Sequence, residues 1–99
     1  MERAKRLTLL ALGGVVDPEL GLDVVSLGLV YGIQTTPDAL RVDMTLTTRG
    51  CPMGEVIVGM AREALDGIAG QRRVDLRLVW EPAWEPGMMS PGAKADLLR

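Results

Sequence analysis

Two segments of the chain carry apolar residues at the spacing of a helix that buries one face. Residues 3–13 form the shorter pattern, and the glycines that follow predict the end of that helix. Residues 52 to about 69 form the longer one, with Gly67 and Gly70 marking its end. The apolar positions are Ala4, Leu7, Leu10 and Ala11, then Val56, Ile57, Met60, Ala61, Ala64, Leu65 and Ile68. The sequence therefore predicts one short and one long amphipathic helix.

Three further segments have the composition or the alternating pattern of β-strands. Residues 29–35 and 40–48 are separated by residues 36–39, a connection short enough for a hairpin. In the second segment one face is apolar, whereas Arg41, Asp43, Thr45 and Thr47 point the other way. For Thr45 this pattern favours a solvated face of the strand. Apolar residues at alternate positions in 74–80 predict a third strand.

The order of these elements predicts the fold class. Residues 15–21 are rich in turn-forming residues and predict a connection, and Ser90 with Pro91 predicts the start of a short closing helix. The order is then helix, strand, strand, helix, strand, helix. This order suits a single α+β domain over residues 1–99, a small two-layer sandwich in which a three-stranded mixed sheet packs against the helices.

The segment between the last strand and the closing helix, residues 81–89, is too rich in proline for regular structure. Trp80 directly precedes this segment, and Trp84 lies within it. Large aromatic side chains beside a sheet usually cover apolar surface. We therefore expect this tail to pack over the sheet edge near Cys51, with Trp80 at the core, while the role of Trp84 stays open.

Composition and charge exclude several classes of function. The chain has 11 basic and 13 acidic residues and no grouping of basic with aromatic side chains, so nucleic acid is not an expected partner. No apolar run has membrane-spanning length, and a single cysteine forms no internal disulfide, which predicts a cytoplasmic protein without a membrane partner. The absence of histidine excludes Ser-His-Asp triads, Cys-His pairs and histidine metal sites.

Cys51 is the candidate reactive group, and it stands in the stretch TLTTRGCPMG, residues 45–54. Proline is favoured at the first position of a helix, so Pro52 places Cys51 at the N-cap. Free backbone N–H groups and the helix dipole would stabilise a thiolate there, and Arg49 would add to this. A small apolar residue packed between strand and helix fits the same position. The position alone leaves both roles open.

Four residues with side-chain oxygens could accompany the thiol. Thr47 and Thr48 lie at the end of the predicted second strand, where their hydroxyls could donate to sulfur, a metal-bound group or an anion. Ordinary strand propensity is the alternative explanation for both. Asp17 and Glu19 flank a proline in the predicted turn, where they could serve as metal ligands, acid/base groups or anchors for loop N–H groups.

Several motifs, in this order, resemble the SufT/PaaD family of iron–sulfur maturation proteins. They are VDPELG at 16–21, VSLGLVY at 25–31, MTLTT at 44–48 with GCP at 50–52, WEPAW at 80–84 and MS at 89–90. The resemblance runs from about residue 15 to 93. The chain ends without the cysteine-rich extension of phenylacetate-pathway members, and Pro91-Gly92 stands where the family usually has acidic residues. It therefore resembles a minimal, stand-alone member.

The resemblance implies a small α+β domain that helps to assemble iron–sulfur clusters or to deliver them to clients, and it points away from an enzyme. It implies a site made of Asp17, Glu19, Thr47, Thr48 and Cys51, with the Asp17 loop near the start of the long helix. Cys51 would handle metal, sulfide or cluster transiently. The expected partners are iron–sulfur assembly proteins and client apo-proteins.

Ligand chemistry limits how such a chain could hold its cargo. A cluster normally takes four protein ligands, mostly thiolates, and this chain has one cysteine. We therefore expect no permanently bound cofactor, but a labile cluster or iron shared across a homodimer, with a partner's thiols or glutathione, or with oxygen ligands from Asp17 and Glu19. Two alternatives stay open. One is a thiol enzyme with Cys51 as nucleophile and Asp17 or Glu19 as base. The other is an adaptor that binds through Trp84 and the tail.

Overall fold

The structure is a computed structural model that describes residues 2–47 and 54–92. Its elements are α1 (Glu2–Leu12), β1 (Val16–Asp17), β2 (Leu22–Asp23), β3 (Val30–Thr35), β4 (Ala39–Met44), α2 (Gly54–Ala69), β5 (Arg73–Leu78) and the 3-10 helix η1 (Pro86–Met88). The two main helices and the three main strands follow one another in the predicted order.

The main sheet has the order β3-β4-β5 and is mixed, as predicted. Strands β3 and β4 are antiparallel and form a hairpin, in which the Thr36 hydroxyl accepts a hydrogen bond from the Ala39 N–H at 3.0 Å. Strands β4 and β5 are parallel, in unbroken register from Ala39 opposite Arg73 to Met44 opposite Leu78. A parallel pair needs a crossover connection, and α2 provides it.

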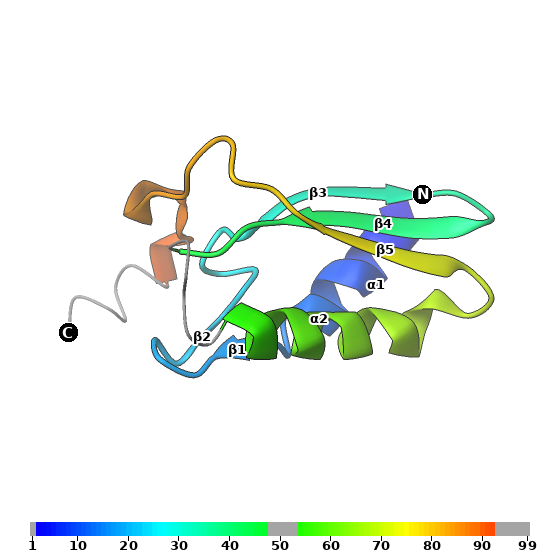
Figure 1. The fold of residues 1–99 in the computed structure, drawn as a ribbon, viewed down its shortest axis with the longest axis horizontal. Helices are drawn as coiled ribbons and strands as arrows, with labels where there is room; N and C mark the ends of the chain where they lie inside the picture. Colours follow the sequence, from blue (N-terminus) through cyan, green and yellow to red (C-terminus); the bar gives the residue numbers. More distant parts are fainter. Residues whose placement is uncertain (1, 48–53, 93–99) are drawn as a thin grey trace.

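Both helices lie on one face of the sheet, so the molecule has two layers (Figure 1). The core lies between these layers because β4 and α2 each turn an apolar row toward it. The residues of these rows that are buried are Leu40, Val42 and Met44 of β4 and Ile57, Ala61, Leu65 and Ala69 of α2. The α+β two-layer prediction is confirmed.

Two of the sequence predictions near the site are wrong in detail. Residues 15–21 are more than a connection, because Val16 pairs with Asp23 and Asp17 with Leu22 in a small antiparallel hairpin. Two-residue strands are too short to leave an alternating pattern. Thr45 is fully buried, and β4 ends at Met44 instead of continuing to residue 48. Because the chain leaves the strand at this point, alternation along β4 no longer decides which way the Thr45 side chain points.

The C-terminal part also differs from the prediction. β5 begins one residue early and ends at Leu78, which leaves Trp80 just beyond the strand. The proline-rich tail contains the short helix η1, where Pro86 supplies the fixed φ that suits a first helical position. The closing helix predicted from Ser90 begins at residues 91–92 and otherwise falls outside the described residues.

Candidate functional site

Asp17, the first of the predicted site residues, organises the turn of the β1–β2 hairpin. Its carboxylate Oδ1 accepts hydrogen bonds from the backbone N–H groups of Glu19 at 2.8 Å and Leu20 at 3.3 Å. Its backbone carbonyl accepts a third from Gly21 at 2.8 Å. The Asp17 residue is only 3 % exposed. Of the three roles that the sequence left open, these contacts are those of an anchor for loop N–H groups.

The other predicted site residues are described only in part. Glu19 is exposed on the hairpin turn, and Thr47 is half-buried after the end of β4. Thr48 and Cys51 lie outside the described residues. Figure 1 shows the β1–β2 hairpin and the first turn of α2 at the same end of the molecule, as the resemblance implied. The structure thus places the β1–β2 hairpin, which carries Asp17 and Glu19, at the end of the molecule where α2 begins.

An apolar groove of about 390 Å³ lies beside the start of α2. It borders both ends of the segment that carries Cys51, because Leu46 lines it on one side of that segment and Gly54 on the other. The remaining lining residues are Glu55, Val58 and Gly59 of α2, Leu78 at the end of β5, and Trp80 just beyond that strand. Among the lining residues in the described part of the chain, Glu55 has the single charged side chain.

A second feature of this end is the close packing of the tail on the turn that precedes β3. Gly28 has a φ of +78°, which favours glycine, and a Cβ at this position would overlap the carbonyl oxygen of Met88 and lie 2.8 Å from its carbonyl carbon. Nearby, the backbone N–H of Ser90 donates to the carbonyl of Ser26 at 2.8 Å. The tail therefore lies directly on the backbone of this turn.

Two aromatic side chains fix the tail to the same turn. The indole Nε1–H of Trp84 donates to the carbonyl of Leu27 at 2.7 Å, and the Tyr31 hydroxyl donates to the carbonyl of Pro82 at 2.8 Å. Partial burial raises the pKa of Tyr31 above its ordinary value, and the negative charge of Glu85 raises it further. The Tyr31 phenol therefore stays protonated and able to donate at neutral pH. Trp80 and Trp84 both pack against the core, as predicted for Trp80.

These contacts explain why motifs far apart in the sequence occur together. The stretch at 25–31 supplies the turn, and the stretches at 80–84 and 89–90 supply the tail that packs on it. We name this assembly, made of residues 26–31 and 80–90, the tail–turn closure. Sequence reasoning missed Gly28 and Tyr31 as its contact points. The one signal for Gly28 and Tyr31 in the sequence was their place inside the family motif at 25–31.

The described residues hold no ready metal site. Among them, no three cysteine, aspartate or glutamate side chains come together in a way that could hold a metal ion. Within the same residues, no helix has the length and apolar character needed to cross a membrane.

Comparisons with known proteins agree on one family. Residues 9–76 match the family described as "Iron-sulfur cluster assembly protein". The chain is 44 % identical over 84 residues to the Fe-S protein maturation auxiliary factor SufT of Staphylococcus aureus, covering 84 % of this chain and 96 % of that protein. It is 43 % identical over 88 residues to the Fe-S protein maturation auxiliary factor YitW of Bacillus subtilis, covering 88 % and 86 % of the two chains.

A solved structure shows the same fold. The crystal structure of a domain of unknown function, DUF59, from Bacillus anthracis superposes with a TM-score of 0.85 at 36 % sequence identity. The match covers 94 % of this chain and 89 % of the other. The likeness therefore extends over both layers and is not restricted to one motif.

Proposed function

Because the chain belongs to the iron–sulfur cluster assembly protein family, we propose that it assists the assembly of iron–sulfur clusters or their delivery to client proteins. The observation that carries this proposal is the match of residues 9–76 to the family. It is supported by two relatives, matched over most of their length, whose names describe auxiliary factors of Fe-S protein maturation. The proposed partners are iron–sulfur assembly proteins and client apo-proteins of the cytoplasm.

In this proposal the cluster is a cargo and not a resident cofactor. A cluster is normally held by four protein ligands, and the chain has one cysteine and no histidine. The other ligands must then come from a second copy, a partner protein or a small thiol. A site completed from outside releases its cargo when the outside ligands leave, which suits delivery better than electron transfer.

Cys51 is the proposed working thiol, with Thr47 and Thr48 beside it in the sequence. Soft thiolate ligands bind iron–sulfur centres better than oxygen ligands do. The apolar groove supports this assignment because Leu46 and Gly54 line it at the two ends of the Cys51 segment. Apolar surroundings limit the access of water, and water hydrolyses exposed clusters.

Asp17 and Glu19 have a supporting role in the proposal. The Asp17 carboxylate already accepts two hydrogen bonds from its own turn, at 2.8 and 3.3 Å. A general base must reach the proton that it takes up, and an oxygen held by two N–H donors is less available for this task. We therefore assign Asp17 to holding the hairpin turn, on which Glu19 is exposed to a partner. This assignment favours an assembly factor over a thiol enzyme.

The proposal is tested by anaerobic reconstitution of the full chain with iron and sulfide. Absorption spectroscopy and native mass measurement show whether a cluster forms, and an apo-enzyme whose activity requires a cluster is then added. We expect the reconstituted chain to activate the apo-enzyme faster than the same iron, sulfide and small thiol without the chain. Equal activation rates with and without the chain would refute the proposal.

A further inference from the structure

The two edges of the main sheet differ in how they are protected. The β3 edge contains a β-bulge between Val30 and Gly32 and is contacted by α1. The β5 edge has no bulge, since its six residues keep regular register with β4, and they include no proline, glycine or lysine; α2 contacts β5 from the core face, as α1 contacts β3. Bulges, prolines and charged side chains, lysine above all, are the usual means by which an edge strand avoids pairing with another chain, and of these β5 has only Arg73, Asp75 and Arg77, which carry both signs of charge. The β5 edge is therefore open to a further strand.

The hydrogen bonds of β5 show which of its backbone groups are available. The N–H of Arg73 donates to the carbonyl of Asp38 and that of Val79 to the carbonyl of Met44, both at 2.9 Å. In a parallel ladder every second residue of a strand bonds to a given neighbour, so the odd-numbered residues of β5 face β4. The N–H and C=O groups of Val74, Leu76 and Leu78 then point to the open edge. Within residues 2–47 and 54–92, no backbone hydrogen bond to these groups is present.

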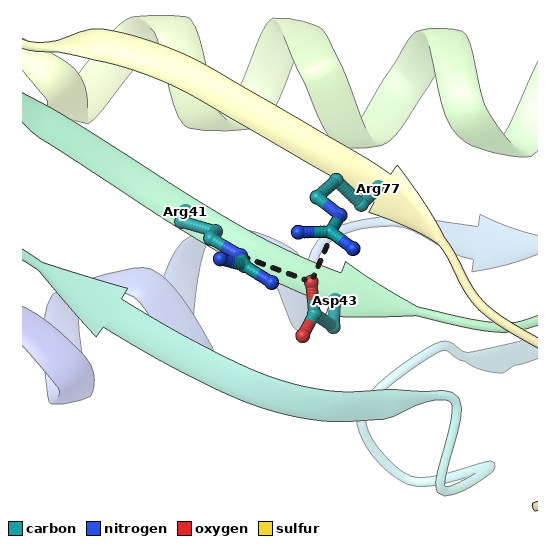
Figure 2. Close-up of polar contacts among 3 residues, drawn as sticks. All are labelled: Arg41, Asp43 and Arg77. Atoms are coloured by element: carbon teal, nitrogen blue, oxygen red, sulfur yellow. Dashed lines mark hydrogen bonds and ion pairs between the residues drawn. The ribbon is translucent and has the colours of Figure 1, made fainter. Parts of the chain in front are cut away.

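The side chains of β5 alternate between the two faces of the sheet, with the apolar ones on one face and the charged ones on the other. Val74, Leu76 and Leu78 stand opposite Leu40, Val42 and Met44 of β4, the buried row that faces the helices. On the outer face, Nε of Arg77 lies 4.0 Å from Oδ1 of Asp43. The same oxygen lies 3.4 Å from Nε of Arg41 (Figure 2). The Arg77 side chain is 50 % exposed, so its guanidinium has further donors available. Leu78 is 42 % exposed at the apolar groove.

We propose that two copies of this chain pair through β5, antiparallel and with Leu76 opposite Leu76 of the second copy. The two sheets would then join into one six-stranded sheet with all helices on the same face. Three residue pairs, Leu76 with itself and Val74 with Leu78 in both directions, would each exchange two backbone hydrogen bonds. This register uses every free N–H and C=O group of the strand.

The charges select this register over its neighbours. With Leu76 on the two-fold axis, Asp75 of each copy lies opposite Arg77 of the other, giving two attractive pairs on the outer face. Moving the axis to Asp75 would place Asp75 opposite Asp75 and Arg73 opposite Arg77, which is repulsive. Moving it to Val74 would leave the exposed Leu78 opposite Gly70, without an apolar partner. A shift by a single residue would put apolar side chains opposite charged ones.

The pairing has a geometric consequence for the groove. The two copies of Leu78 would be offset by four residues, about 13 Å along the strands. Both grooves would therefore lie on the helix side of one continuous sheet, each beside the β5 strand of the second copy. This inference does not depend on the proposed function, because it rests on the backbone and charges of β5 alone.

Two single substitutions test the pairing together. Asp75→Arg makes both cross-strand pairs Arg–Arg in its own homodimer, and Arg77→Asp makes both Asp–Asp. In the mixed dimer of the two variants, both pairs are again Arg with Asp. We expect the parent chain to dimerise by analytical ultracentrifugation, each variant alone to dimerise at least about tenfold more weakly, and the mixture to recover the affinity of the parent. A tenfold change corresponds to about 1.4 kcal/mol.

The control is Arg6→Asp, which replaces an exposed arginine by aspartate, as Arg77→Asp does. Arg6 lies on α1, the helix that contacts the opposite edge strand β3. It should leave the dimer affinity unchanged. Circular dichroism establishes that all variants fold, since Arg77→Asp brings a second carboxylate near Asp43 within its own chain. A parent chain that stays monomeric at millimolar concentration would overturn the proposal. So would folded Asp75→Arg and Arg77→Asp proteins that each dimerise as well as the parent.

Discussion

The tail–turn closure and the apolar groove share lining elements but are built in opposite ways. In the closure, backbone lies directly on backbone at Gly28 and Met88, and Trp84 and Tyr31 donate hydrogen bonds across it. In the groove, Gly59 has no heavy atom within 4 Å of the position that a Cβ would occupy, and Leu78 is 42 % exposed. At the contact of Gly28 with Met88 the closure has no room for a further atom, although the same assembly borders a cavity of about 610 Å³, whereas the groove is open at Gly59.

This difference separates stability from function. A substitution at a contact point of the closure, such as Gly28 or Trp84, must displace packed atoms or remove a hydrogen bond, so it should lower the free energy of unfolding. In the groove, a side chain added at Gly59 fills empty space and should leave the fold intact. Family motifs contribute to both regions, because Trp80, the first residue of the tail, lines the groove while Trp84 donates a hydrogen bond across the closure. The shared motifs are therefore not all markers of the functional site.

The largest effect is expected for Gly28→Ala. The added Cβ would overlap the carbonyl of Met88 and would also occupy a positive φ of +78°. Overpacking and backbone strain together should lower the free energy of unfolding by about 2–5 kcal/mol, measured by urea unfolding. Gly87→Ala, in η1 with nothing within 4 Å of its Cβ position, is the matched control and should change it little. Equal effects of the two substitutions on the free energy of unfolding would show that the contact between Gly28 and Met88 does not hold the closure together.

A smaller effect is expected for Trp84→Phe. Phenylalanine keeps most of the apolar contact but lacks the N–H that donates to the carbonyl of Leu27 at 2.7 Å. The free energy of unfolding should fall by about 1–2 kcal/mol, because a partly buried carbonyl loses its donor. An unchanged urea midpoint would show that this bond does not hold the tail.

The Tyr31→Phe variant tests the closure through pH. The Tyr31 hydroxyl donates to Pro82, and its pKa is raised by burial and then by Glu85. A raised pKa in the folded state means that the contribution of this proton is complete below about pH 10 and is lost as pH rises through the folded-state pKa. The parent should therefore lose stability above about pH 10 relative to Tyr31→Phe. Parallel stability curves of parent and variant between pH 9 and 11.5 would contradict this.

The smallest effect on stability, with a clear effect on function, is expected for Gly59→Leu. Leucine has a higher helix propensity than glycine, so the free energy of unfolding should rise by about 0.5–1 kcal/mol. The new side chain would occupy the groove beside Val58 and should slow activation of a client apo-enzyme. Gly67→Leu, also in α2 with open space around it but outside the groove lining, should give the same stability gain without slower activation. Identical activation rates would show that the groove has no function.

The sequence predicted those parts of the fold that repeat a pattern. Helices of 11 and 16 residues and strands of six residues are long enough for periodicity to show which face is buried. The two-residue strands of the β1–β2 hairpin are not, and neither is Thr45, whose burial depends on the chain turning away from the sheet after Met44. Pattern reasoning needs several residues in one regular element.

The candidate site was predictable only as a set of residues and not as an arrangement. Asp-Pro in a turn indicated a side chain that could bond to loop N–H groups, and Asp17 does so. Nothing local to Gly28 indicates that Met88, sixty residues later, lies against it. Contacts of this kind are set by the tertiary fold, which brings the tail back to the turn before β3.

The central claim is that Cys51 is the thiol that handles the cluster, and Cys51→Ser tests it most directly. The sequence predicts that Cys51 caps the long helix, and serine is a good N-cap, so on that prediction the variant should unfold at the same urea concentration as the parent. A hydroxyl stays protonated at neutral pH and is a poor ligand for soft iron–sulfur centres, so the variant should fail to activate a client apo-enzyme. Cys51→Ala should fail likewise, with a further loss of stability of about 0.5–2 kcal/mol if the sulfur also caps α2. A folded Cys51→Ser protein that activates the client at the parent's rate would contradict the claim.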